Sequence, residues 1–144
     1  SDINMDKKLA DMIKEITDGI ELPQSEVFDL DDENFEAFAF IKKQEGMEGV
    51  ASEAQIITMA HSLILVRTQE KDTENIAKEI SENANTRKWI CVEAEAGKVF
   101  YGPNYVFLVM TYKDDVDSLK ANFEKVTGIK EAKSLDVKSQ DMPQ

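Results

Sequence analysis

Apolar residues near the start of the chain recur at helical spacing. Five of them occupy positions i, i+4, i+7, i+8 and i+11: Met5, Leu9, Met12, Ile13 and Ile16. This stripe predicts an amphipathic helix over residues 5–18, with Asn4 and Gly19 as its capping residues. The next segment, residues 20–30, has no sustained period and contains Pro23. We therefore expect a loop there that directs its apolar side chains onto the core.

The second part of the chain has the pattern of strands that alternate with helices. Four segments have the apolar, β-branched content of strands: VASEA (50–54), SLILVRT (62–68), KVFY (98–101) and NYVFLVMTY (104–112). The last two flank Gly102-Pro103, which predicts a β-hairpin. Apolar stripes predict helices over residues 73–86 and 114–127, and Gly128 would end the second of them.

Two further segments are short and ambiguous. Asp31 or Asp32 can begin a short helix that runs through Phe38. Segment 87–97 contains β-branched residues typical of a strand, but Trp89, Val92 and Ala96 have helical spacing. We favour a short helical stretch that continues from the preceding helix.

This order predicts an α+β fold with an antiparallel four-stranded sheet, connected β-β-α-β-β-α. Segment 104–112 is apolar at both odd and even positions, so both faces of the sheet must be covered. We expect the two later helices on one face and the N-terminal helical segment on the other, where Leu9, Met12, Ile13 and Ile16 would pack. Residues 1–129 would form a single domain, and residues 130–144 a polar C-terminal tail.

Composition and charge exclude several classes of function. The chain has 144 residues, 17 basic and 29 acidic side chains, and a net charge of −12. Such a surface repels polyanions, so we expect no nucleic-acid partner and no attraction to anionic lipid. No apolar run approaches the roughly 18 residues of a membrane span. One cysteine and one histidine exclude an internal disulfide framework and a multi-histidine metal site.

Candidate catalytic and metal-binding residues are few. Asp29, Asp31, Asp32 and Glu33 resemble part of a calcium loop, but the loop glycine and the distal glutamate are missing, so a helix N-terminus is the better interpretation. His61 and Ser62 are neighbours, which on a strand point to opposite faces. We interpret Cys91 as a buried, inert thiol. We therefore expect no catalytic residues, no metal and no cofactor.

Aromatic residues and the single histidine are the remaining candidates for a ligand site. Tyr101 and Tyr105 flank the predicted hairpin turn, where we expect exposed aromatic side chains. Trp89 and His61 complete this speculative ligand-binding set, although a core position is the default for Trp89 and a structural role the better interpretation of His61.

Three segments resemble a domain-of-unknown-function family (number 4358) of small lipoproteins from Gram-positive, Clostridia-type bacteria. They are DKKLADMIKEI (6–16), SEAQIITMAHSLILVRTQE (52–70) and KVFYGPNYVFLVMTYKDD (98–115). The resemblance covers most of residues 5–127 and brings no catalytic residues. It implies an exported protein, held at the cell membrane by a lipidated cysteine upstream of the domain. Cys91 lies in mid-chain and cannot be that anchor, and the first residue, Ser1, agrees with removal of an upstream segment.

The favoured function is a non-enzymatic, extracytoplasmic module that binds an unknown protein or small ligand at the cell surface. Contact with the membrane would come only through a lipid anchor that is absent from this chain. The alternative is a hydrolytic or metal-dependent enzyme that uses the acidic clusters, and the composition also permits a cytosolic domain. Convergence of three or more carboxylates on one point would favour the enzyme, whereas their dispersal over separate helix starts would favour the binding module.

Overall fold

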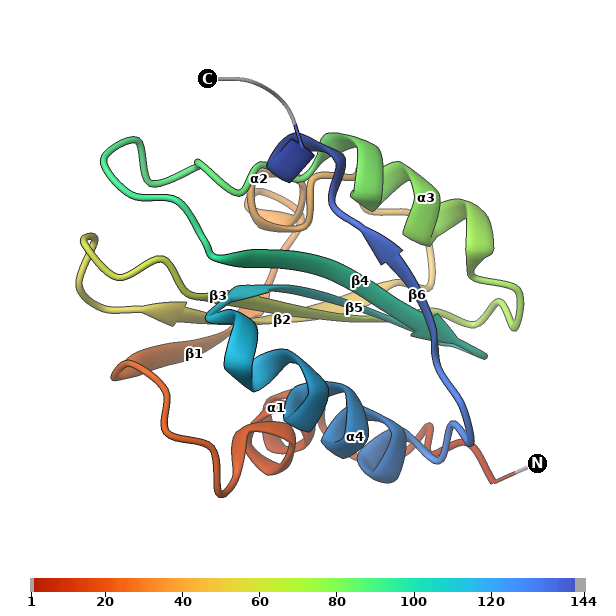
Figure 1. Cartoon of the computed structure of the whole chain (residues 1–144). Coiled ribbons are helices and arrows are strands. Elements are labelled where there is room, and N and C mark those ends of the chain that lie inside the picture. Colours follow the sequence, from red (N-terminus) through yellow and green to blue (C-terminus); the bar gives the residue numbers. More distant parts are fainter. Residues whose placement is uncertain (1, 142–144) are drawn as a thin grey trace.

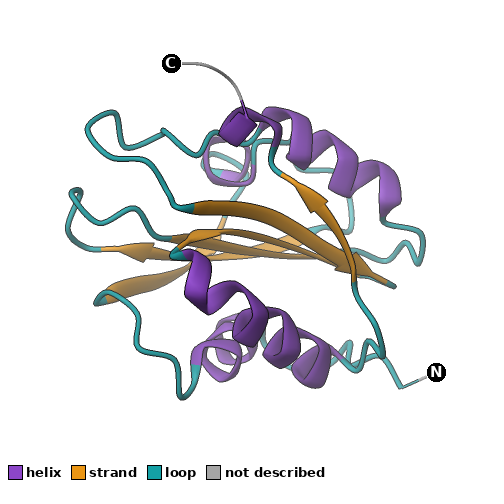
Figure 2. Ribbon diagram, viewed as in Figure 1, coloured by secondary structure: helices purple, strands orange, loops and turns teal. Residues whose placement is uncertain are grey.

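The computed structural model describes residues 2–141, which form an antiparallel sheet between two layers of helices (Figures 1 and 2). The sheet has six strands in the order β1-β2-β3-β5-β4-β6, and every neighbouring pair is antiparallel. The strands are β1 (Ser25–Leu30), β2 (Glu48–Ala54), β3 (Ser62–Arg67), β4 (Ala96–Gly102), β5 (Tyr105–Thr111) and β6 (Lys133–Asp136). The predicted α+β class with an antiparallel sheet is confirmed, but the predicted number of four strands is wrong.

Each face of the sheet carries two helices (Figure 1). Helices α1 (Leu9–Thr17) and α4 (Val116–Thr127) cover one face, and α2 (Phe35–Ala39) and α3 (Glu74–Asn83) cover the other. Two short 3-10 helices, Lys113–Asp115 and Lys138–Asp141, precede α4 and follow β6. The two later helices therefore lie on opposite faces, not together on one face as predicted.

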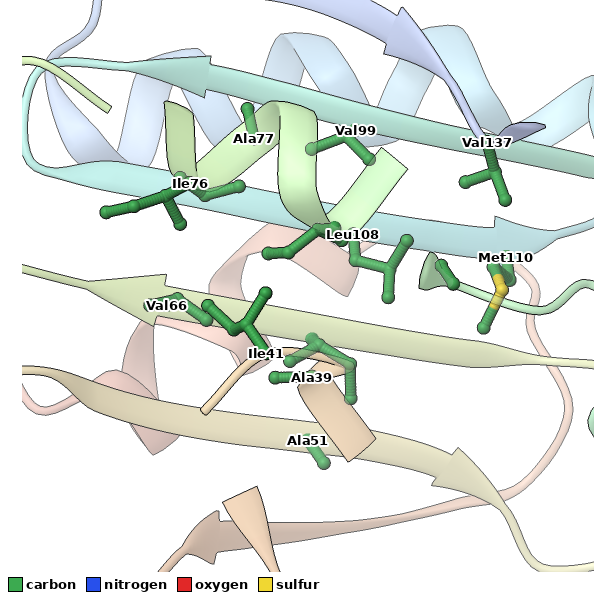
Figure 3. Close-up of a cluster of buried hydrophobic side chains, with 14 of the residues drawn as sticks. Ala39, Ile41, Ala51, Val66, Ile76, Ala77, Val99, Leu108, Met110 and Val137 are labelled. Carbon is green, nitrogen blue, oxygen red and sulfur yellow. The ribbon is translucent and has the colours of Figure 1, made fainter. Parts of the chain in front are cut away.

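The central strands are buried on both sides, as their sequence requires. In β5, Leu108 points into the cluster under α2 and α3, whereas Phe107 points into the cluster under α1 and α4. Figure 3 shows part of the first cluster, where side chains of the sheet such as Leu108 and Val99 meet Ile76 and Ala77 of α3. One sheet thus separates two cores, and each core depends on its own helix pair.

The N-terminal helix packs as its apolar stripe predicts. Four side chains of α1 are buried against the sheet and α4: Leu9, Met12, Ile13 and Ile16. The helix begins at Leu9, later than predicted, because the side chain of Asn4 accepts hydrogen bonds from the backbone N–H groups of Asp6 and Lys7 at 3.2 Å. This Asn-based turn precedes the helix and replaces its expected first turn. Gly19 follows α1 with φ +78°, as a C-terminal glycine should.

Both edge strands come from segments that were predicted to be irregular. β1 pairs with β2 inside segment 20–30, and its neighbours Val27 and Phe28 each reach a different core. β6 pairs with β4 inside the predicted polar tail, and Val137 after it is fully buried. The expectation of a tail with little to bury is therefore wrong for residues 133–137, while residues 142–144 lie outside the described part. Edge strands are half exposed, so their composition stays polar.

Segment 87–97 does not contain the predicted helical stretch. α3 ends at Asn83, and the chain then forms a turn-rich loop that leads to β4 at Ala96. The N–H of Ala94 donates to the carbonyl of Thr86 at 2.9 Å and closes this loop. Trp89 and Val92 pack against the core from the loop, so their spacing reflects separate contacts and not a helical face.

Candidate functional site

The two tyrosines of the predicted ligand site are buried on opposite faces of the sheet. Tyr101 is 7% exposed and belongs to the core under α3, whereas Tyr105 is fully buried under α1. The expectation that both are exposed is wrong, because the hairpin turn contains only Pro103 and Asn104 and the paired strands continue to its edge. The wall of an open hollow of about 490 Å³ at the hairpin includes Tyr101.

Tyr105 holds the N-terminal segment in place. Its hydroxyl donates to the carbonyl of Asn4 and accepts a hydrogen bond from Arg67 Nη1 at 3.2 Å. Arg67 Nη1 also donates to the carbonyl of Lys7 at 2.7 Å, and Arg67 Nε forms an ion pair with Glu48 at 3.0 Å. Burial raises the pKa of Tyr105, so the hydroxyl stays protonated and serves as a structural donor.

Trp89 and His61 lie at the opposite end of the strands from Tyr105. We call this the loop end of the sheet. It carries the β2–β3 loop (residues 55–61) and the α3–β4 loop (residues 84–95), which both project from this end of the sheet in Figure 1. The four predicted site residues therefore do not form one site.

A polar cluster joins the α3–β4 loop to the ends of strands β2 and β3. The Lys88 ammonium lies 2.7 Å from a carboxylate oxygen of Glu53 on β2 and 3.3 Å from the hydroxyl of Ser62 on β3. Ser62 donates its hydroxyl proton to the other oxygen of Glu53. The same ammonium lies 5.2 Å from the ring centroids of both Phe38 and Trp89, within the range of cation–π contacts.

Sequence reasoning missed this cluster. Glu53 and Ser62 are directly opposite in the β2–β3 ladder, so the register of that hairpin would have paired them. No signal in the sequence indicates Lys88, because the α3–β4 loop that carries it has no regular structure.

The cluster contains the residue types of a serine–lysine nucleophile pair, but its hydrogen bonds differ from those of such a pair. In a serine–lysine pair the lysine accepts the serine proton, whereas Lys88 Nζ donates to both Glu53 and Ser62 and lies against two aromatic faces. Ser62 is fully buried and its proton is directed to Glu53, away from Lys88. This geometry fastens the α3–β4 loop to the sheet and leaves no accessible nucleophile.

His61 is equally enclosed. It is fully buried, and its Nδ1 lies 2.8 Å from the hydroxyl of Thr111 on β5. Its Nε2 is buried and has no hydrogen-bond partner among the described residues. Burial, reinforced by the charge of Lys88, lowers the pKa of His61 to about 4, so the imidazole is neutral at pH 7. A ligand cannot reach it without opening the fold.

Four large apolar side chains are exposed at the loop end. Ile56, Ile57 and Met59 of the β2–β3 loop are 54%, 77% and 39% exposed, and Ile90 of the α3–β4 loop is 91% exposed. We call these four residues the apolar tip. Elsewhere in residues 2–141 the large apolar side chains are buried or partly buried. Sequence reasoning missed the tip, since apolar residues in the run QIITMAH also suit a strand.

The acidic groups lie apart from one another. Asp31 accepts hydrogen bonds from the N–H groups of Glu33 and Asn34 at 2.9 Å, in the turn before α2. Asp114 and Asp115 lie in the 3-10 helix before α4. Within residues 2–141 no three histidine, cysteine, aspartate or glutamate side chains gather where they could hold a metal ion. Cys91, predicted to be buried, is exposed because it lies beside Ile90 in the loop.

Comparison with known proteins found no match among protein-family models, curated proteins or solved structures. In the described part of the chain, no helix has both the length and the apolar character needed to cross a bilayer.

Proposed function

We propose that this domain is a non-enzymatic protein-binding module that acts outside the cytoplasm, at the cell surface. The observation that carries the proposal is the apolar tip. Exposed apolar side chains that cluster on an otherwise polar surface mark interaction sites. The tip occupies two loops at one end of a rigid sheet, which is a common location for binding residues.

The enzymatic alternative has less support. The groups with catalytic potential are enclosed: Ser62 and Lys88 both bind Glu53, and His61 is fully buried. The carboxylates are distributed over separate helix starts, which favours the binding module over a hydrolytic or metal-dependent enzyme.

The proposed location rests on the resemblance to the lipoprotein family, whose members carry a lipidated cysteine upstream of the domain. Residues 4–7 are bound by Tyr105 and Arg67, at the end of the strands opposite the tip. β5 spans seven residues, or roughly 20 Å. A membrane tether upstream of Ser1 would therefore leave the apolar tip directed away from the membrane, toward a partner.

Photo-crosslinking in the native cells tests the binding function. A photoreactive phenylalanine analogue would replace, one at a time, Ile57 and Ile90 at the tip, Lys14 on the outer side of α1 and Lys133 on β6. All four side chains are exposed, so the substitutions should not disturb the fold. We expect a discrete adduct with one identified polypeptide from at least one position. Absence of an adduct from all four positions would contradict the proposal.

Cys91 provides the test of location, because it is the single cysteine of this chain and is exposed. A thiol reagent that does not cross membranes should label Cys91 in intact cells, and a Cys91→Ser variant should lose the label. Labelling that appears only after lysis would place the domain in the cytoplasm and overturn this part of the proposal.

A further inference from the structure

We infer that the apolar tip seats in an apolar groove of a partner protein whose rim is basic, with Ile90 as the anchoring side chain. This inference rests on the proposed binding function and adds the surface, the anchor and the chemistry of the partner.

The backbone conformation of Ile90 is unfavourable for a residue with a β-branched side chain. Its φ is +70°, in the left-handed region, where a β-branched residue is a genuine outlier. Two other non-glycine residues of the described chain share this region. Asn104 belongs to a residue type that tolerates it, and the Phe40 side chain packs against the core. Ile90 has neither compensation, since its side chain projects almost entirely into solvent.

A strained and exposed apolar residue is unfavourable for the free domain in two ways. Glycine or asparagine would relieve the backbone strain, and a polar side chain would remove the exposure. Strain of this kind persists where a function requires the side chain. An isoleucine held outward at a loop apex suits insertion into a pocket of another molecule.

One contact to the sheet and one ion pair within the loop hold the segment that presents Ile90. Lys88 fastens it to Glu53 and Ser62, and Arg87 forms an ion pair with Glu93 at 2.9 Å. A loop fixed before binding loses little conformational entropy on association, which favours affinity.

The tip itself is close to neutral. Residues 54–61 contain no aspartate, glutamate, lysine or arginine, and His61 is neutral at pH 7. The two cations of the neighbouring loop are paired with Glu53 and Glu93. The surface that the tip meets should therefore be apolar and uncharged.

Exposed acidic residues lie in segments that reach the loop end from β1 and from the turn before α4. Glu21 lies in the segment before β1, where the carbonyl of Gln24 accepts the N–H of Gln55. Glu95 accepts the N–H of Lys113 at 3.1 Å, so it lies beside the turn that carries Asp114. Glu21, Glu95 and Asp114 are all exposed.

These acids and the net charge of −12 attract a partner with a basic rim. The same charge opposes a second copy of this chain or an anionic bilayer as the occupant. Four side chains are too few for a complete interface of about 800 Å² per partner, so the tip should form its central hot spot.

The photo-crosslinking experiment above separates this inference from the proposed function. We expect adducts from positions 57 and 90 only. Adducts confined to position 14 or 133 would agree with a protein-binding function but would contradict the apolar tip as the binding surface. No adduct from any position would overturn both.

Calorimetry with the partner that crosslinking identifies, purified in its free form, then tests Ile90 as the anchor. Ile90→Gly should weaken binding about 30-fold, the loss expected of a hot-spot side chain, while the unfolding midpoint rises. Ile90→Val, which keeps the branched shape, should remain within about threefold of the original affinity. Unchanged affinity of Ile90→Gly would contradict the role of Ile90.

The dependence of affinity on salt and on Asp114 tests the chemistry of the partner. Affinity should fall several-fold between about 50 and about 300 mM NaCl, and Asp114→Asn should reduce it further at low salt. Affinity that does not fall with salt would contradict the basic rim.

Two sedimentation experiments test the other occupants. Sedimentation with zwitterionic vesicles should show no membrane binding, and sedimentation velocity of the domain alone should show no dimer. Vesicle binding or dimerisation that Ile90→Gly abolishes would assign the tip to a lipid surface or to a second copy instead.

Discussion

Glu53 and Lys88 are 35 positions apart in the sequence, and their side chains meet at 2.7 Å in an ion pair that is largely shielded from solvent. The side chains are 15% and 18% exposed, respectively. This pair joins the second strand of the sheet to the loop that presents Ile90, so it links the stability of the fold to the position of the proposed anchor.

Removal of the Lys88 charge should destabilise the domain. Lys88→Met keeps a long side chain against Phe38 and Trp89 but leaves the Glu53 carboxylate without its cation. We expect a loss of about 2–3 kcal/mol in the free energy of unfolding, somewhat below the range for fully buried pairs. The double variant Glu53→Gln/Lys88→Met should be less destabilised than the sum of its two single variants.

Lys78 provides the matched control for this change. It pairs with Glu74 on the exposed side of α3, with side chains 56% and 48% exposed and a distance of 3.6 Å. Lys78→Met should change the free energy of unfolding by less than about 0.5 kcal/mol. Urea denaturation measures all four variants. Equal effects of Lys88→Met and Lys78→Met would show that the loop-end pair is not a structural contact.

Substitution of Leu108 tests the central position of β5. Leu108 is fully buried in the cluster between α3 and the sheet, so Leu108→Ala should lower the free energy of unfolding by about 2–5 kcal/mol. Glu79 lies on the exposed side of α3, and Glu79→Ala should have little effect. Chemical denaturation compares the two. An unchanged midpoint for Leu108→Ala would be incompatible with a buried β5.

Helices and strands whose buried residues recur at a regular spacing can be predicted from the sequence. The stripe from Leu9 to Ile16 predicts α1 and its packing face, and the two-sided apolar pattern of β5 predicts helices on both faces. β1 and β6 escape detection because edge strands are half exposed and their polar residues mask the period. The assignment of helices to faces depends on the crossover from β3 through α3 to β4, which no local pattern encodes.

The candidate site is harder to predict than the fold, for a related reason. An apolar residue such as Ile57 looks the same in a sequence whether it is buried or exposed. Only the loop geometry reveals that it faces solvent. The tyrosines of the hairpin predicted a ligand site at its turn. A two-residue turn, however, leaves Tyr105 inside the sheet, where its hydroxyl binds the N-terminal segment.

Stability should fall in mild acid because of His61. The pKa of the folded-state imidazole is lowered to about 4, against an ordinary value of 6.5, so the unfolded chain binds this proton first as the pH falls. The loss begins below about pH 6.5 and continues until the folded state is protonated near pH 4. At pH 5 the domain should have lost roughly 2 kcal/mol relative to pH 7.5.

His61→Gln isolates this contribution, because it is the only histidine in the chain. The variant can keep a hydrogen bond to Thr111 but cannot titrate in this range. Its free energy of unfolding should therefore change less between pH 7.5 and pH 5, whatever its absolute stability. Urea denaturation at both pH values gives the comparison. An equal loss in both proteins would mean that His61 is accessible to protons in the folded state.

Ile90→Gly should stabilise the free domain even though it removes an apolar side chain. The side chain has almost no packing to lose, and glycine adopts the left-handed backbone at φ +70° without strain. The higher entropy of glycine in the unfolded chain offsets part of this gain. We expect an increase of about 0.5–1 kcal/mol in the free energy of unfolding, measured by urea denaturation.

Gly19 offers the converse experiment at a matched position. Its φ is +78°, and an added Cβ would meet nothing within 4 Å, so Gly19→Ala changes only the backbone preference. We expect that variant to lose about 1 kcal/mol, because left-handed backbone costs an alanine about 1–2 kcal/mol and the lower entropy of its unfolded chain returns part of that. If Gly19→Ala destabilises the domain while Ile90→Gly leaves it unchanged or weaker, the α3–β4 loop contains contacts of Ile90 that outweigh the strain. Ile90 would then be retained for its packing in the loop and not for a partner. If the two changes have opposite signs, the free domain is less stable with isoleucine at position 90 than with glycine, which is the condition expected of a residue kept for binding.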